Sequence, residues 1–201
     1  MRALLAGAGG LTAALLIPLL LIAALLGSLP AATTGGDVTA AQIGDLTTPA
    51  AYVGASTGCT STDPTGGRCL TPATRHAHDE LTRAFGPPGP NSAIRSAGCW
   101  DAHAWNPTSD HPLGRACDYF PGRAGTFPQG QELQNGWRMA NWLRAHADTL
   151  KVKYIIWQGR IWSAGGSDLE GWGRPYTGGG VYDATDATGG HFDHIHLSIA
   201  T

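Results

Sequence analysis

Two short segments of the chain concentrate residue types that bind metals and move protons. The first, SDHPLGRACDYF at residues 109–120, places His111 seven residues before Asp118. The second, GGHFDHIHLSIAT at residues 189–201, holds a dense group of such side chains: His191, Asp193, His194 and His196. Imidazole and carboxylate groups are ligands that zinc prefers, and a catalytic zinc keeps three protein ligands and one water. The two segments together therefore predict a zinc site.

The histidines of the second segment have a spacing that suits a strand. His194 and His196 lie two residues apart, so on a β-strand both side chains point to the same face. One of them can bind the metal while the other faces the substrate. Taken alone, His111 and Asp118 also fit a histidine in a turn and an aspartate at the surface. The choice between these roles and metal binding therefore depends on the full motif.

The full motif points to a known family. The segment from Ser109 to Asp118 fits S-x-H-x-x-G-x-A-x-D at every fixed position, and it resembles the LAS metallopeptidases. These include D-Ala-D-Ala carboxypeptidases and dipeptidases, the penicillin-insensitive murein endopeptidase and the hedgehog signalling domain. The resemblance covers roughly residues 70–200 and is specific at the two motifs. It implies Zn²⁺ as the cofactor, with His111, Asp118 and His196 as its ligands.

The C-terminal motif leaves the general base open. HFDHIH resembles the murein endopeptidase form, in which a histidine two positions before the third ligand lies in the active site; here that residue is His194. Many D-Ala-D-Ala peptidases instead place a Glu three residues before the last ligand and a Trp directly before it. Those positions hold Asp193 and Ile195. We therefore expect the catalytic base to be His194 or Asp193, with His194 favoured.

Other side chains have weaker expected roles. Substrate binding or support of the ligands is expected for three residues: Ser109, His191 and Arg95. Ser109 equally fits a residue that stabilises a turn, and Arg95 a solvated arginine. Surface positions are expected for His103 and His146, and positions in the cleft for Trp100 and Trp105.

Composition and cysteine content limit the class of protein. The chain has 201 residues and a formal charge of −2, which does not suggest a nucleic-acid-binding protein. An even number of cysteines in an exported domain indicates disulfides. We expect the pairs Cys59–Cys69, which closes a loop-like segment, and Cys99–Cys117, which joins segments beside the site. A four-cysteine zinc site is the alternative, but the chain has no CxxC pair.

The N-terminal part predicts export. Residues 3–26 carry no charge and can span a bilayer as a helix, although small residues after them also fit a cleaved signal. Both alternatives place the rest of the chain outside the cytoplasm, either anchored with the N-terminus inside or secreted. The expected organisation is an anchor or signal at 1–27, a flexible linker at 28–58 and a zinc peptidase-like domain at 59–201.

The remaining elements predict an α+β fold. A helix is expected from Thr71, its N-cap, to Gly86, and a second over residues 131–151. Gln158-Gly159-Arg160 is expected to join a β-hairpin, and residues 163–190 to form a long loop. Further short strands are expected in AIRSAGCW, RACDYF and DHIHLSI. The expected class is a small antiparallel sheet with helices packed on it, preceded by an N-terminal hydrophobic helix and a flexible linker.

The sequence thus predicts an exported zinc-dependent peptidase that cleaves peptide bonds of peptidoglycan stems or crosslinks. The expected partner is a peptidoglycan peptide, with no nucleic acid and with membrane contact only through the N-terminal segment, and the protein is expected to be a monomer. The alternative is a non-catalytic, zinc-stabilised module that binds the wall or a partner. Cleavage of the amide between sugar and peptide is a third possibility, because it uses similar chemistry.

Overall fold

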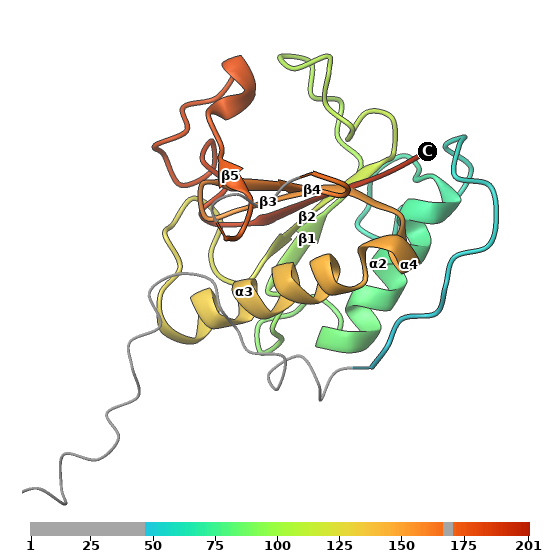
Figure 1. Ribbon diagram of the computed structural model, residues 1–201, viewed down its shortest axis with the longest axis horizontal. Helices are drawn as coiled ribbons and strands as arrows, with labels where there is room; N and C mark the ends of the chain where they lie inside the picture. Colours follow the sequence, from blue (N-terminus) through green and yellow to red (C-terminus); the bar gives the residue numbers. More distant parts are fainter. Residues whose placement is uncertain (1–46, 167–170) are drawn as a thin grey trace, which may run out of the picture. The chain divides into compact units, whose positions relative to one another are not determined.

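The architecture is a six-stranded antiparallel sheet with helices on one face (Figure 1). The computed structural model describes residues 47–166 and 171–201. Its helices are α2 (Pro72–Phe85), α3 (Gly130–Ala145), α4 (Ala147–Leu150) and the short 3₁₀ turn η1 (Gly178–Gly180). Its strands are β1 (Ser96–Gly98), β2 (Ala116–Phe120), β3 (Val152–Trp157), β4 (Arg160–Ser163), β5 (Arg174–Pro175) and β6 (Ile195–Ile199). The predicted α+β class is confirmed, while the predicted N-terminal helix lies outside the described residues.

The strands follow the order β1-β2-β6-β3-β4-β5, and each neighbouring pair is antiparallel. The C-terminal strand β6 therefore lies between β2 and β3. This order brings the segment around residues 109–120 directly beside the C-terminal histidines, although Asp118 and His196 are 78 residues apart in the chain.

Helix α2 forms where the sequence predicts it. Thr71 is the N-cap, and its side chain accepts a hydrogen bond from the backbone N–H of Thr74 at 3.2 Å. Pro72 occupies the first turn and Gly86, at φ 90°, ends the helix. Leu81 is buried against the sheet, as the spacing of apolar residues predicts.

The second predicted helix is two helices. Residues 131–151 were expected to be continuous, but α3 ends at Ala145 and α4 begins at Ala147. His146, between them, leaves helical geometry with φ −111° and ψ 23°. Leu143 and Leu150 are still buried, because the break keeps both apolar faces on the sheet.

Residue alternation along the strands gives the sheet two different faces. In β6 the odd-numbered residues Ile195, Leu197 and Ile199 belong to the hydrophobic core under the helices. The even-numbered His196 and Ser198 point to the opposite face, as a period of two requires. That opposite face carries the candidate site.

The hairpin and the following loop differ in detail from the prediction. The turn residues are Gln158 and Gly159, both at positive φ, which suits a tight two-residue turn. Arg160, predicted as a turn residue, opens β4 instead. The segment predicted as a loop at 163–190 contains the short strand β5, whose two residues, Arg174 and Pro175, are too few to show an alternating pattern.

Both predicted disulfides are present. Cys59–Cys69 and Cys99–Cys117 have Cα separations of 5.3 and 3.9 Å, below the distance at which a bridge becomes impossible. Gly114, within the first motif, packs against the first bridge at φ +66°. A Cβ at this position would lie 2.7 Å from the Cys59 sulfur, so the motif requires glycine here. Two disulfides are typical of a domain that folds in an oxidising environment outside the cytoplasm.

Part of the expected linker is folded onto the domain. Tyr52 donates its backbone N–H to the Thr149 carbonyl, and the Thr47 carbonyl accepts from the Trp142 indole. The packed structure therefore begins before residue 59. The predicted anchor or signal at 1–27 lies outside the described residues, and within the described ranges no helix has the length and apolarity to cross a membrane.

Candidate metal centre and cleft

The site is built on the sheet face that the helices leave uncovered. Asp118 on β2 pairs in register with His196 on β6, so their side chains lie side by side. His111 reaches them from the turn before β2. One ligand atom from each of the three residues can be chosen so that all lie within 4.8 Å of one another. The structure therefore brings together the three residues predicted as metal ligands.

The distances between these donors suit a metal ion. His111 Nε2 lies 3.3 Å from His196 Nδ1 and 3.3 Å from Asp118 Oδ2, and His196 Nδ1 lies 2.9 Å from Asp118 Oδ1. Donors held at zinc distances in a tetrahedron are about 3.3 Å apart. Two imidazole nitrogens and a carboxylate in this arrangement can hold a metal ion.

Hydrogen bonding orients His111 for this role. Its Nδ1 contacts the backbone carbonyl of Cys99, and a proton on Nδ1 leaves Nε2 free to bind a cation. Cys99 is fixed in turn by its disulfide to Cys117 on β2. The second disulfide therefore holds the group that sets the orientation of a ligand.

The local field favours positive charge at this point. Burial alone would lower the pKa of His111, but the Asp118 carboxylate outweighs burial and raises the pKa to about 9. Burial alone would raise the pKa of Asp118, but His111 and His194 hold it well below its usual range. Burial lowers the pKa of His196. Positive charge is thus stabilised among the three side chains, which is the sign of charge that a bound metal ion carries.

His194 and Asp193 form a pair beside the three donors. His194 lines the cleft, with Nε2 3.7 Å from Asp118 Oδ1. Its Nδ1 lies 2.6 Å from Asp193 Oδ1. Asp193 is turned away from the cleft: its second oxygen accepts hydrogen bonds from the Gly125 N–H at 2.6 Å and the Thr188 hydroxyl at 3.0 Å. Of the two predicted bases, His194 is the one that reaches the cleft.

Three weaker predictions have distinct outcomes. Ser109 lies in the cleft wall, and its hydroxyl accepts the backbone N–H of His111 at 3.2 Å, so it stabilises the turn that presents the ligand. His191 lines the cleft at φ 56°, and its ring centroid lies 4.5 Å from that of His194. Burial holds the pKa of His191 well below its usual value, which favours the neutral form of the ring. Arg95 is exposed just before β1 and is not among the residues that line the cleft.

The cleft above the metal donors has a volume of about 540 Å³. Two arms rise beside it in Figure 1, the first at residues 101–109 and the second at residues 176–190. The Asn106 amide on the first arm donates to the Tyr182 hydroxyl on the second at 3.1 Å. The walls are rich in aromatic rings: Trp100, Trp105, Phe120, Tyr154, Tyr176 and Tyr182. Trp100 and Trp105 were both expected here.

Two residues near the site escaped prediction. His103, expected at the surface, lines the cleft, and its ring stacks on His111 with centroids 4.6 Å apart. Its φ of 42° is unusual for a non-glycine residue. Asp110 is buried and binds Lys153 at 2.8 Å and Arg115 at 2.9 Å, which fixes the turn that carries His111. A local pattern shows neither role, because Asp110 depends on Lys153 in the distant strand β3 and the stacking of His103 depends on how its own arm folds back onto His111.

The described residues contain a second group of possible donors, formed by His78, Cys99 and Cys117. Both of its sulfurs are consumed in a disulfide. The donors on the cleft face therefore remain the candidate metal centre.

The fold and site together define a disulfide-bonded α+β domain with a three-residue candidate metal centre in an aromatic cleft. The sequence matches the family described as VldE, C-terminal domain, over residues 66–188, and the chain belongs to that family. The matched range includes His111 and Asp118 and ends before the C-terminal histidines. No curated protein and no solved structure matches the chain.

Proposed function

We propose that this chain is an exported, zinc-dependent peptidase that hydrolyses peptide bonds of peptidoglycan. The observation that carries the proposal is the convergence of His111, Asp118 and His196 at the floor of a cleft, with His194 beside them. The resemblance of both motifs to the LAS metallopeptidases supports the reaction class, and the export features support the location of the substrate.

Three residues bind the metal in this proposal, and a fourth transfers the proton. His111, Asp118 and His196 would hold the zinc, which when bound acidifies a water and polarises the scissile carbonyl. His194 takes a proton from the attacking water as its oxygen bonds to the carbonyl carbon. The same imidazole then passes that proton to the amine that leaves when the carbon–nitrogen bond breaks.

The surroundings of His194 fit that cycle. Burial alone would lower its pKa, but Asp118 and Asp193 outweigh burial and raise it. Asp193 Oδ1 lies 2.6 Å from Nδ1 of His194 and so fixes the imidazole ring, with Nε2 of His194 directed toward the cleft. We therefore assign His194 as the base and Asp193 as a positioning residue.

The test is a digest of purified peptidoglycan by the full-length, zinc-loaded chain, with products identified by mass. New peptide termini are expected with the wild type and not with the His194→Ala variant, which should retain zinc. If the zinc-loaded wild type releases no peptide termini but still binds the wall, the non-catalytic module replaces the peptidase. Release of whole stem peptides from the glycan would instead indicate cleavage of the sugar–peptide amide.

A further inference from the structure

One row of paired residues crosses the whole sheet on the cleft face. The register pairs Gly98 with Asp118, Asp118 with His196, His196 with Ile156, Ile156 with Ile161, and Ile161 with Arg174. Directly paired residues in an antiparallel sheet point to the same face. After Gly98 the row therefore passes two candidate metal donors, continues over two aliphatic residues that line the cleft, and ends at a guanidinium.

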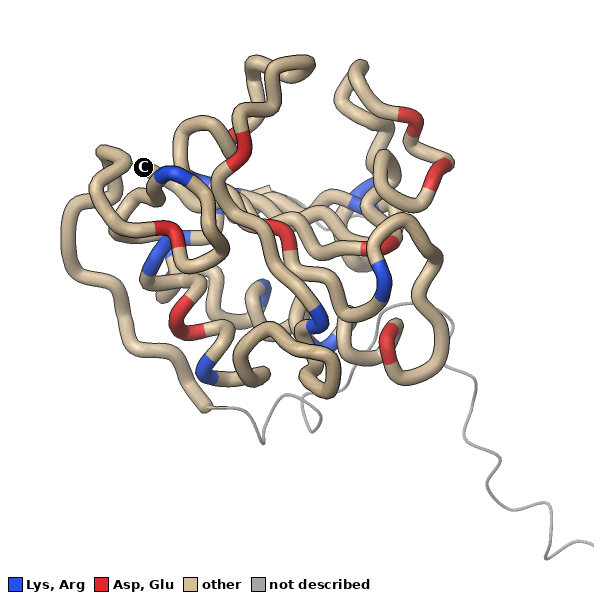
Figure 2. The backbone as a smooth tube through the Cα atoms, turned by 180° about the vertical axis from the view of Figure 1, so that it is seen from behind, with Lys and Arg blue, Asp and Glu red and all other residues tan. Residues whose placement is uncertain are grey.

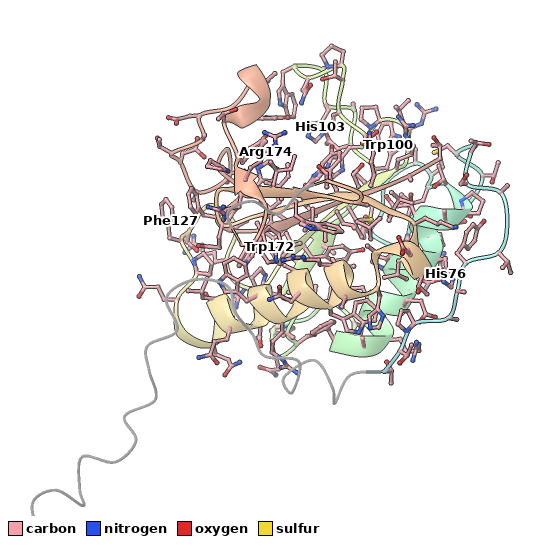
Figure 3. All side chains as sticks on the ribbon, in the orientation of Figure 1. His76, Trp100, His103, Phe127, Trp172 and Arg174 are labelled. Carbon is pink, nitrogen blue, oxygen red and sulfur yellow. A yellow bond between two sulfur atoms is a disulfide. The ribbon has the colours of Figure 1, made fainter. Side chains whose placement is uncertain are left out.

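The orientation of Arg174 follows from its neighbours. Trp172 is buried, and its indole donates to the Asn141 amide oxygen on α3 at 2.9 Å. Arg174 follows two residues later but lies on the other face of the sheet, because it pairs with Ile161, which lines the cleft. Figure 3 shows this difference: Trp172 lies on the helix side of the sheet, whereas Arg174 lies on the same side as His103.

The short strand that presents Arg174 is firmly held. The Arg160 guanidinium donates to the carbonyl of Trp172 at 2.8 Å and to that of Gly173 at 2.7 Å. Gly173, at φ +68°, lets the backbone approach the Ile161 carbonyl, where a Cβ would lie at 2.4 Å. The position of Arg174 is therefore set by packing on both sides of β5.

The Arg174 side chain is available to a ligand. It is exposed, and within the described residues its guanidinium makes no hydrogen bond or ion pair. Other cations near the cleft are engaged: Arg115 and Lys153 bind Asp110, and Arg160 binds the carbonyls before β5.

The charge around the cleft makes this cation distinctive. Figure 2 shows Asp or Glu positions in red on both arms, whereas the Lys and Arg positions in blue are spread over the rest of the fold. The lining residues include the carboxylates Asp101 and Asp118, and neither Lys nor Arg is among them. Beyond the metal donors, an anionic substrate group is repelled along the arms and is attracted at the end of the row.

We propose that Arg174 binds a carboxylate of the peptide substrate and so sets which bond lies over the metal donors. The inference rests on the proposed peptidase function and adds a specificity residue to it. Three strand spacings separate Arg174 from His196, or about 14 Å between backbones. An extended peptide covers about 3.3–3.6 Å per residue, so the carboxylate lies about two to four residues from the scissile bond. Arginine suits this task because its planar fork binds a carboxylate through two parallel hydrogen bonds.

The test compares a peptidoglycan stem tetrapeptide with free carboxylates and the same peptide with its carboxylates amidated. The full-length, zinc-loaded chain is used as wild type, as Arg174→Gln and as Arg174→Lys. Arg138→Gln is the matched control, because it removes the same charge from α3, where Arg138 lies over the Phe85 ring. Hydrolysis is measured with the native His194, and binding is measured by calorimetry with His194→Ala added to each form.

The wild type is expected to show a KM about tenfold lower for the free acid than for the amide, with similar kcat. Arg174→Gln should remove that preference at unchanged kcat, Arg174→Lys should restore part of it, and Arg138→Gln should leave it intact. Equal KM values of the wild type for acid and amide would overturn the role of Arg174 while leaving the peptidase intact. If neither peptide is cleaved, the peptidase proposal fails, and the binding data decide the role of Arg174. If the free-acid peptide binds more tightly than the amide, and Arg174→Gln removes that difference, the role of Arg174 is supported. If the two peptides bind equally well to the form that keeps Arg174, the role is overturned.

Discussion

The two faces of the sheet are made by alternate residues of the same strands, yet they differ in almost every physical property. On the helix face of β6, Leu197 is 1% exposed and packs in the core. On the cleft face, its neighbour His196 is also buried, but among polar groups that carry charge. Burial stabilises the fold on the first face. On the second face burial strengthens the interactions among a few ionisable groups, because charges interact more strongly away from water. The substitutions below test whether the two faces act independently.

The largest effects are expected from substituting these two adjacent residues of β6. His196→Ala should weaken zinc binding by more than about 100-fold, because a ligand is lost, while the metal-free domain stays folded. Leu197→Ala should lower the free energy of unfolding by about 2–5 kcal/mol and leave zinc affinity nearly unchanged. Metal content by mass spectrometry and urea unfolding of the metal-free forms measure the two effects. Loss of zinc in both variants would show that the faces are coupled.

A similarly large effect is expected on the rate of peptide hydrolysis when the proposed base His194 is removed and the three metal ligands are kept. His194→Ala should retain zinc and lose about 10²–10⁴-fold in the rate of peptide hydrolysis. Asp193→Asn should cost about 10–100-fold, because Asp193 acts through the orientation of His194. Steady-state kinetics on wall peptides at matched zinc occupancy measure both. Should Asp193→Asn be the more damaging of the two, our assignment of the base would be reversed.

An intermediate effect is expected on the pH dependence of metal binding. Burial would lower the pKa of His111, but Asp118 raises it to about 9 in the metal-free protein. A proton and a cation compete for this imidazole, so apparent zinc affinity should rise about tenfold per pH unit up to about pH 9. In the metal-free protein, the stability that His111 contributes is fully present below its unfolded pKa of about 6.5 and is lost as pH rises through about 9. Calorimetry in buffers of different ionisation enthalpy should therefore detect proton release on zinc binding at pH 7. Zinc affinity that does not change between pH 6 and 8 would contradict the predicted competition.

The smallest effect is expected at the N-cap of α2, whose side chain bonds within the helix and not to the cleft residues. Thr71→Ala removes the side-chain acceptor of the Thr74 N–H and should cost about 1 kcal/mol of unfolding free energy. Zinc affinity and hydrolysis should stay at wild-type values, because α2 packs on the helix face. Thermal unfolding of the metal-free forms measures the cost. A Thr71→Ala domain that unfolds normally but binds zinc poorly would show that the cap influences the cleft.

Elements with local signals could be predicted from the sequence, whereas those that depend on distant contacts could not. Thr71, Pro72 and Gly86 mark the ends of α2 through their own backbone preferences, and the structure confirms them. The break at His146 has no comparable signal, because the apolar spacing continues through it. Strand β5 has two residues and exists because Arg160 and Trp172 hold its backbone in place.

The candidate site follows the same division. His111, Asp118 and His196 could be grouped because two dense motifs carry them, and sheet pairing then brings the motifs together. Asp110 was missed because its role depends on Lys153 in β3, and His103 was missed because its stacking on His111 depends on the path of its arm. Arg174 was also missed, because its place in the row depends on the register of five strand pairs.

Binding of one zinc ion by His111, Asp118 and His196 at the floor of the cleft can be seen in a crystal structure of the zinc-loaded chain with anomalous scattering at the zinc edge. A single anomalous peak is expected, with His111 Nε2, Asp118 and His196 Nδ1 about 2.0–2.2 Å from it. The peak should disappear in His196→Ala crystals and remain in His194→Ala crystals. A zinc ion bound elsewhere, or a fully occupied site that lacks any of the three residues, would show that these side chains are not together the zinc ligands.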